Sequence, residues 1–315
     1  AGLSPNDPQL AAVSERLVSL IQSADVPEEL VELLQTHYQA IEQLVQPGIC
    51  LAMRSSAVRE DSEASFAGQY RSVLNVTGDG LAAAYKEVVA SSFSPWAISY
   101  RQMAGIDPAE TPMCVLGLAM VDVAASGVLY TADPANGQAE TMLISAIHGL
   151  GELLVSGNAA ADTFVYNRKS ATVSHREIAA KKMRLDAVQG GIEEHEVATD
   201  EASQAAITDK EAVCLTQAGA QLETLFGGPQ DIEWAIDRER KLYILQCRPL
   251  QVVAKATEPI PEPDELPLLR DGLCASQGVA CGKVRIVDEQ TDLSSVTDHD
   301  IMVAKTAAPR YAEIM

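Results

Sequence analysis

Residues 231–250 carry polar side chains whose types and spacing could bind a metal ion and a phosphate. The stretch reads DIEWAIDRERKLYILQCRPL, and its alternation of polar and apolar residues predicts two β-strands joined by a turn. Residues two apart in a strand share a face. Asp231 and Glu233 therefore lie on one face of the first strand, and Gln246 and Arg248 on one face of the second. Carboxylate and amide oxygens suit Mg²⁺, and a guanidinium can bind a phosphate through two parallel hydrogen bonds.

A turn over the four polar residues 238–241 determines which residues of the two strands face each other. With this turn, four pairs are directly opposed: Asp231–Arg248, Glu233–Gln246, Ala235–Ile244 and Asp237–Leu242. Directly opposed Cβ atoms lie about 4.5–5.5 Å apart, so one face gathers two carboxylates, an amide and a guanidinium. The other face is apolar and is expected to be core. The alternative is a solvated hairpin in which the Asp231–Arg248 pair contributes at most about 1 kcal/mol.

A second segment, residues 51–76, offers groups that could bind a chain of phosphates. It reads LAMRSSAVREDSEASFAGQYRSVLNV. Arg54 ends an apolar strand, so packing fixes its position, while Gly68 lets backbone N–H groups approach an anion and Ser72 adds a hydroxyl. The segment is not a P-loop, because GxxxxGK[ST] is absent. Taken alone, a Ser-rich loop with arginines is also typical of a surface turn.

Four blocks of the sequence resemble a known family in the right order. RSSAVREDSEASFAGQY resembles the signature of the ATP-binding domain of phosphoenolpyruvate synthase and pyruvate phosphate dikinase. SGVLYTADP, GLGELLVSG and DIEWA…LYILQCRPL resemble later blocks of that domain, and together the four cover about residues 50–250. ASQGVACGKVRIV, with the later DHDIMVAKTAAPRYAEIM, resembles the start of the family's swivelling phosphohistidine domain. The resemblance implies an ATP-grasp-like fold with ATP and Mg²⁺ as cofactors.

The resemblance also implies roles for residues that bind the phosphates. Arg54 would hold phosphates of ATP. Gly68, Gln69 and Ser72 would form the phosphate loop, with Ser72 where relatives often have Thr. Arg248 would contact the phosphates from the hairpin.

The metal and the adenine base would have their own residues. Glu233 and Gln246 would ligate Mg²⁺. Adenine would lie against the strand LGLAMV, where backbone groups from Leu118 to Met120 read its edge, although relatives usually carry Gln where Leu118 stands. No catalytic residue is expected within the chain, because the family's phosphate-binding Lys lies in an N-terminal lobe and its phosphorylated His is expected beyond Met315.

The elements that position these groups are predicted to be mixed α and β. Residues 1–48 form a helical segment with a period near 3.6, and residues 49–251 form an ATP-grasp-like α/β (α+β) nucleotide-binding domain. Residues 252–270 include the Pro-rich stretch EPIPEPDELPLL, which is typical of a semi-rigid linker. Residues 271–315 begin a β-rich swivelling domain that the chain contains only in part. Within the larger domain, residues 80–105 are predicted to be helical with a break at Pro95, and residues 200–225 are predicted to form another helix. His148 precedes the turn GLGE and is expected to be a packing residue.

Composition limits the partners. The formal net charge of −21 argues against a nucleic-acid partner and against an anionic membrane surface. No apolar run reaches the roughly 18 residues that span a bilayer, and the first residues lack the pattern of a signal peptide. The six cysteines form no CxxC motif and are expected to be reduced thiols in a cytoplasmic protein.

Function follows from the resemblance. The expected activity is that of a dikinase which transfers phosphoryl from ATP through a phosphohistidine to pyruvate, forming phosphoenolpyruvate. Two alternatives remain: a phosphotransferase of the same family with a rifamycin-type antibiotic or a glucan as acceptor, and a degenerate nucleotide-binding module without catalysis. Expected partners are ATP and pyruvate, with a homodimer left open for the intact protein.

Overall fold

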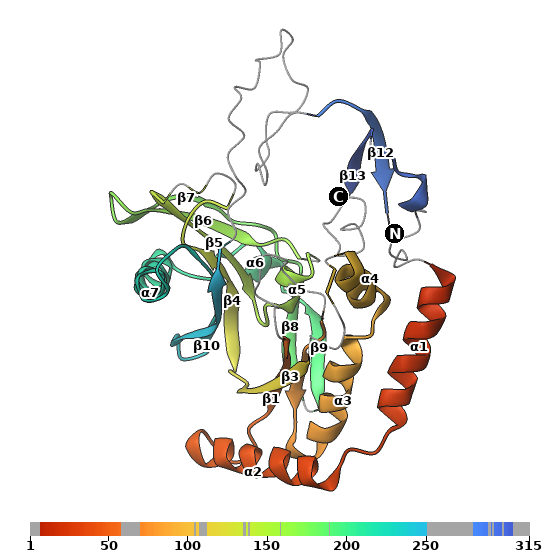
Figure 1. The fold of residues 1–315 in the computed structure, drawn as a ribbon. Coiled ribbons are helices and arrows are strands. Elements are labelled where there is room, and N and C mark those ends of the chain that lie inside the picture. The colour runs from red at the N-terminus through yellow and green to blue at the C-terminus, as the bar shows by residue number, and fades with distance from the viewer. Residues whose placement is uncertain are drawn as a thin grey trace. The chain divides into compact units, whose positions relative to one another are not determined.

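The computed structural model describes most of the chain, and its contacts divide the chain into two compact units. The described residues are 7–57, 70–103, 105–106, 112–134, 137, 139–157, 159–188, 190–250, 280–288, 291, 293–297 and 299–304. The first unit comprises Ala1–Asp122 and Leu185–Glu194, and the second Val123–Arg184 and His195–Met315. Figure 1 labels the elements of both.

The first unit begins with the predicted helices. Its elements are α1 (Pro8–Ser23), α2 (Glu28–Leu44), β1 (Leu51–Ala57), β2 (Val73–Val76), α3 (Leu81–Ser91), α4 (Pro95–Met103) and β3 (Met113–Ala119). α1 starts where Asp7 caps it, with the backbone N–H of Gln9 donating to the Asp7 carboxylate at 2.7 Å. The helix predicted over 80–105 is interrupted before Pro95, as expected.

The three strands of the first unit form a sheet in the order β2-β1-β3, with α3 packed against it. Leu51 and Met53 are each 2% exposed and belong to a core that includes Tyr38 and Val88. Because side chains alternate along a strand, Arg54 lies on the opposite face of β1 from Met53. This sheet therefore has one face packed on helices and another face that carries Arg54.

A hairpin that the sequence analysis did not predict contributes Leu185–Glu194 to the first unit. It consists of β8 (Met183–Val188) and β9 (Gly191–Glu196). Asn75, in the left-handed region at φ 58°, donates its side-chain amide to the backbone oxygens of Val188 and Gly191. One amide on β2 thereby fixes the loop of this hairpin to the three-stranded sheet.

The second unit is built on a six-stranded antiparallel sheet in the order β11-β10-β4-β5-β6-β7. These strands are β4 (Val123–Tyr130), β5 (Thr141–His148), β6 (Asp162–Asn167), β7 (Thr172–Glu177), β10 (Gln230–Asp237) and β11 (Leu242–Pro249). Its helices are α5 (Glu152–Val155), α6 (Thr199–Ala202) and α7 (Asp209–Phe226). The single helix predicted over 200–225 is wrong in one respect, because Thr208 caps α7 and separates it from α6.

One face of the six-stranded sheet packs against α7. Leu129, Trp234 and Leu215 are each fully buried in this core. The helix approaches the sheet closely because it has no side chain at Gly219, where an added Cβ would lie 2.6 Å from Leu129 Cδ2. The other face of the sheet carries Asp231 and the remaining polar residues of the hairpin.

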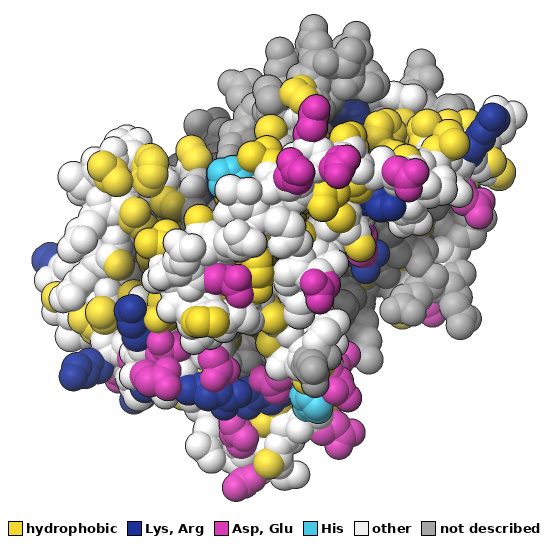
Figure 2. Space-filling model, turned by 90° about the horizontal axis from the view of Figure 1, so that it is seen from below, with side chains coloured by type: hydrophobic (Ala, Val, Ile, Leu, Met, Phe, Trp, Pro, Cys, Tyr) yellow, Lys and Arg dark blue, Asp and Glu magenta, His cyan; other side chains and the backbone are white. Residues whose placement is uncertain are grey.

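The last described strands are β12 (Lys283–Val287) and β13 (Asp300–Ala304), which pair in parallel. The predicted linker, residues 252–270, lies outside the described residues. None of the described helices has the length and apolar character needed to cross a membrane. On the face drawn in Figure 2, Asp and Glu side chains are scattered in small groups among Lys and Arg.

Candidate functional site

The polar end of the β10–β11 hairpin has the predicted pairing. Asp231 opposes Arg248 and Glu233 opposes Gln246. The opposite face of β10 is core, as predicted, with Ile232 and Trp234 fully buried. The four polar groups thus share one face at one end of the hairpin.

The pairing near the turn differs from the prediction. The observed pairs are Trp234–Ile244, Ala235–Tyr243 and Ile236–Leu242, so the predicted pairs Ala235–Ile244 and Asp237–Leu242 are wrong. The loop is one residue shorter than expected, because the backbone N–H of Asp237 donates to the oxygen of Lys241 at 3.1 Å. A bulge at Leu245 restores the missing residue before Gln246.

The bulge changes the composition of the polar face. It puts Tyr243, rather than Ile244, on the same face as Ala235. The Tyr243 hydroxyl donates to Asp237 Oδ2 at 3.1 Å, and Lys241 Nζ lies 4.8 Å from the centre of the Tyr243 ring. The polar face therefore continues from Asp231 to the turn.

Asp231 and Arg248 form a partly buried ion pair. Arg248 Nε and Nη2 lie 2.8 and 2.6 Å from the same carboxylate oxygen, Asp231 Oδ2. The Arg248 side chain is 29% exposed and the Asp231 side chain 11%, which does not fit the alternative of a solvated hairpin. Burial raises the pKa of Asp231 above its ordinary value even though the Arg248 charge opposes the shift. The pair holds the guanidinium in one orientation.

Glu233 and Gln246 fit a Mg²⁺ ion. They are directly opposed, so one carboxylate and one amide oxygen can reach the same ion. On the other side Glu233 faces Val128, which offers no ligand. Two protein oxygens leave the remaining positions of the metal to water and phosphate, as Mg²⁺ prefers. Within the described parts of the chain, no group of three or more His, Cys, Asp and Glu could hold a metal.

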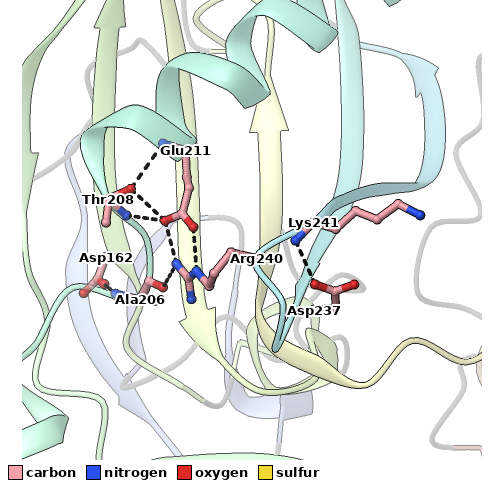
Figure 3. A network of polar contacts seen from close by, with 7 residues as sticks. All are labelled: Asp162, Ala206, Thr208, Glu211, Asp237, Arg240 and Lys241. Carbon is pink, nitrogen blue, oxygen red and sulfur yellow. Dashed lines mark hydrogen bonds and ion pairs between the residues drawn. The ribbon is translucent and has the colours of Figure 1, made fainter.

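The turn of the hairpin is fixed to α7 by a polar network. Arg240, at φ 65°, donates from Nε and Nη2 to the two carboxylate oxygens of Glu211, each at 2.5 Å. Glu211 also accepts from the backbone N–H of Thr208 in the capping box of α7 (Figure 3). Burial tends to raise the pKa of Glu211, but the bonds from Arg240 and Thr208 hold it below its ordinary value. This network restrains the strand that carries Gln246.

In the first unit, Arg54 and Ser72 lie on neighbouring segments. Met53 on β1 pairs with Val73 on β2, so the next position of the ladder brings Arg54 beside Ser72. Across the sheet, Arg54 pairs with Leu116 on β3. The predicted phosphate-loop residues Gly68 and Gln69 lie outside the described residues.

The predicted adenine strand is β3, an edge strand of its sheet. The backbone N–H of Met120 donates to the oxygen of Cys50 at 2.9 Å, so it is engaged within the sheet. Backbone groups of alternate residues point away from the partner strand. The outward edge beside Leu118 and Met120 is therefore formed by the N–H and C=O of Ala119.

Three buried polar residues of the second unit lie near the end of β5. Lys181 and Asp162 are 1% and 0% exposed and form an ion pair at 2.5 Å. His148 is 8% exposed, and its Nε2 has no hydrogen-bond partner among the described residues. Burial, together with the Lys181 charge, lowers the pKa of His148. His148 is thus a buried residue of the second unit, as expected from its sequence position.

Tyr130 belongs to the polar face and was missed from the sequence. It ends β4 and directly opposes Asp231 of β10. Its place becomes visible only once β4 is known to be the neighbour of β10, and no local pattern indicates that pairing.

The chain matches the family described as "Pyruvate phosphate dikinase, AMP/ATP-binding domain" over residues 3–266. It is 34% identical to a probable phosphoenolpyruvate synthase of Archaeoglobus fulgidus, over 98% of this chain and 41% of that protein. It is 31% identical to a phosphoenolpyruvate synthase of Pyrococcus furiosus, over 96% of this chain and 39% of that protein. It is 35% identical to a rifampicin phosphotransferase of Bacillus subtilis, over 81% of this chain and 28% of that protein.

The chain spans no more than about two fifths of the length of these three relatives. The family match covers both the segment of Arg54 and the hairpin of Arg248. The mixed arrangement of helices and sheets agrees with the predicted α/β class. The chain therefore belongs to the pyruvate phosphate dikinase family and comprises its ATP-binding domain.

Proposed function

We propose that this chain is the ATP-binding part of a phosphoenolpyruvate synthase. One phosphoryl group of ATP would pass to a histidine, expected beyond Met315, and from there to pyruvate. Water would accept a second phosphoryl group, so that ATP, pyruvate and water give AMP, phosphoenolpyruvate and phosphate. The proposal is supported by the relatives named phosphoenolpyruvate synthase, which match 96% and 98% of this chain.

The observation that carries the proposal is the geometry of the β10–β11 hairpin. Glu233 and Gln246 would hold Mg²⁺, which would neutralise charge on the phosphates. Arg248, oriented by Asp231 through two hydrogen bonds, would donate to phosphate oxygens. Because the ion pair fixes the guanidinium before the nucleotide arrives, little side-chain entropy is lost on binding.

The first unit would also carry residues that bind ATP. Arg54 and Ser72 would bind phosphates together with Gly68 and Gln69. Adenine would lie beside Leu118 and Met120, but the backbone groups that read its edge would be those of Ala119. This refinement follows from the N–H of Met120, which already donates within the sheet.

Further parts of the proposal concern the intact protein. We expect residues 252–270 to tether the swivelling domain that begins near residue 271, with 49–251 as the nucleotide-binding domain. The five described cysteines are free thiols, which supports a reducing compartment such as the cytoplasm. Pyruvate as acceptor and a homodimer also remain predictions.

Binding of Mg·ATP tests the proposed site. We expect Arg248→Ala to weaken binding by about 10- to 100-fold in isothermal titration, because hydrogen bonds to charged groups contribute about 1.5–3 kcal/mol each. Arg54→Ala should act similarly. The control is Arg176→Ala, which removes an exposed arginine paired with Asp209 on the same sheet and should not alter the affinity. Equal affinity of Arg248→Ala and the unaltered protein would overturn the assignment.

The acceptor requires a separate measurement on the intact protein. AMP formation from Mg·ATP should depend on added pyruvate, and phosphoenolpyruvate should appear in equal amount. AMP formation that depends on rifampicin, and not on pyruvate, would contradict the proposed acceptor while leaving the nucleotide site intact.

A further inference from the structure

Tyr130 places a hydroxyl on the polar face beside the proposed metal and phosphate groups. It directly opposes Asp231, which in turn opposes Arg248, so the three residues form one row across β4, β10 and β11. Opposed side chains in a sheet lie on the same face. Glu233 and Gln246 are opposed to each other two residues farther along β10 and β11, on the same face.

The environment of Tyr130 keeps its hydroxyl protonated. Burial raises the pKa of Tyr130, the negative charges of Asp231 and Glu233 raise it further, and the Arg248 charge opposes them. The phenol is therefore a hydrogen-bond donor throughout the neutral range. The Tyr130 hydroxyl has no hydrogen-bond partner among the described residues, and the neighbouring Asp231 carboxylate accepts from Arg248.

The backbone that carries Tyr130 is held rigidly. The next residue, Thr131, donates its N–H to the oxygen of Gln230 at 2.9 Å, and its Oγ1 accepts from the N–H of Gln230 at 2.7 Å. Arg168, which is paired with Glu223, donates to the Thr131 oxygen at 2.6 Å. The backbone position from which the Tyr130 side chain projects is therefore set before a ligand binds.

The net charge of the polar face favours a neutral donor at this position. Asp231, Glu233 and Arg248 together give this part of the face a net negative charge. That charge repels a polyphosphate unless a metal ion lies between them. A neutral hydroxyl attracts a phosphate oxygen without changing that balance, and it needs no counter-charge. Resting on the proposed function, we propose that the Tyr130 hydroxyl binds the polyphosphate of the nucleotide as a second protein donor of the second unit's face, beside Arg248.

The test is Tyr130→Phe in the intact protein, which removes the hydroxyl and keeps the ring. We expect Mg·ATP to bind about 3- to 10-fold more weakly, the range of one neutral hydrogen bond, and adenosine to bind unchanged. The matched control is Tyr166→Phe. Tyr166 lies in the same sheet within the α7 core, and its hydroxyl should not affect either ligand. The thermal midpoint of Tyr130→Phe should match that of the unaltered protein.

The outcomes separate this inference from the proposed function. Unchanged Mg·ATP affinity in Tyr130→Phe, with weakened binding in Arg248→Ala, would overturn the role of Tyr130 and leave the proposed site standing. An equal loss of adenosine binding would also overturn it, because the hydroxyl would then act on packing and not on phosphate. Absence of Mg·ATP binding by the unaltered protein would overturn the proposed function and this inference together.

Discussion

Replacement of Lys181 by Met should destabilise the second unit strongly. Lys181 is 1% exposed, and its Nζ lies 2.5 Å from Oδ1 of Asp162, which is fully buried. Asp162 also accepts from the backbone N–H groups of Ala179 at 3.0 Å and Ala206 at 2.7 Å. Without Lys181 the Asp162 carboxylate keeps these two hydrogen bonds but loses the positive charge of its ion-pair partner. Removing one partner of a buried pair costs about 3–5 kcal/mol, whereas an exposed pair contributes at most about 1 kcal/mol.

The chain offers a selective fluorescence assay for this prediction. It has two tryptophans: Trp96 in the first unit, and Trp234 in the second unit, fully buried in the core that includes Ala206. In a Trp96→Phe background, Trp234 alone reports urea unfolding of the second unit. For a slope of about 3 kcal/mol per M, Lys181→Met should lower the midpoint by roughly 1–1.7 M.

A matched surface variant tests the role of burial. Arg176→Ala removes the pair with Asp209, whose side chains are 61% and 52% exposed. Its midpoint should fall by no more than about 0.3 M on the same slope. If Lys181→Met shifts the midpoint as little as Arg176→Ala, the buried pair does not stabilise this unit and the reasoning is refuted.

Two further predictions use the same assay. Because the pKa of His148 is lowered in the folded state, its contribution to stability is complete above pH ~6.5 and declines as the pH falls below that value. His148→Phe should therefore show a flatter dependence of the midpoint on pH between about 5.5 and 7, and an unchanged slope would contradict this. Gly127→Ala should lower the free energy of unfolding by about 3 kcal/mol or more, because an added Cβ would lie 1.8 Å from the backbone oxygen of Ser145. Gly228→Ala, where nothing lies within 4 Å, is the control, and similar losses in the two variants would disprove the steric argument.

Much of the fold could be predicted because its signals are local. The 3.6-residue period of α2 and the proline that begins α4 lie within their own segments, as does the alternation along β10. The β8–β9 hairpin was missed because β9 (Gly191–Glu196), whose residues are mostly exposed, lacks an apolar alternation with which β8 could be paired. Its loop is fixed by Asn75, which is more than 100 residues away in the sequence.

The candidate site was predictable where it depends on one hairpin. The pairs of Asp231 and Glu233 came out as predicted because two departures cancel: a loop one residue shorter than expected, and a bulge at Leu245 that restores the count. The pairs predicted between the bulge and the turn were wrong, and Ala235 is opposed by Tyr243 where Ile244 was expected. A bulge depends on the packing of both strands, which the pattern of one strand does not encode.

The sequence by itself determined the residue types of the site and the face of each strand on which they lie, because alternation is a property of a strand alone. Only the tertiary structure decided which strands are neighbours. It brought β4 beside β10 and so added Tyr130 to the row of Asp231 and Arg248. Strand order arises from hydrogen bonds and core contacts between segments about 100 residues apart, and such contacts leave no periodic trace in either segment.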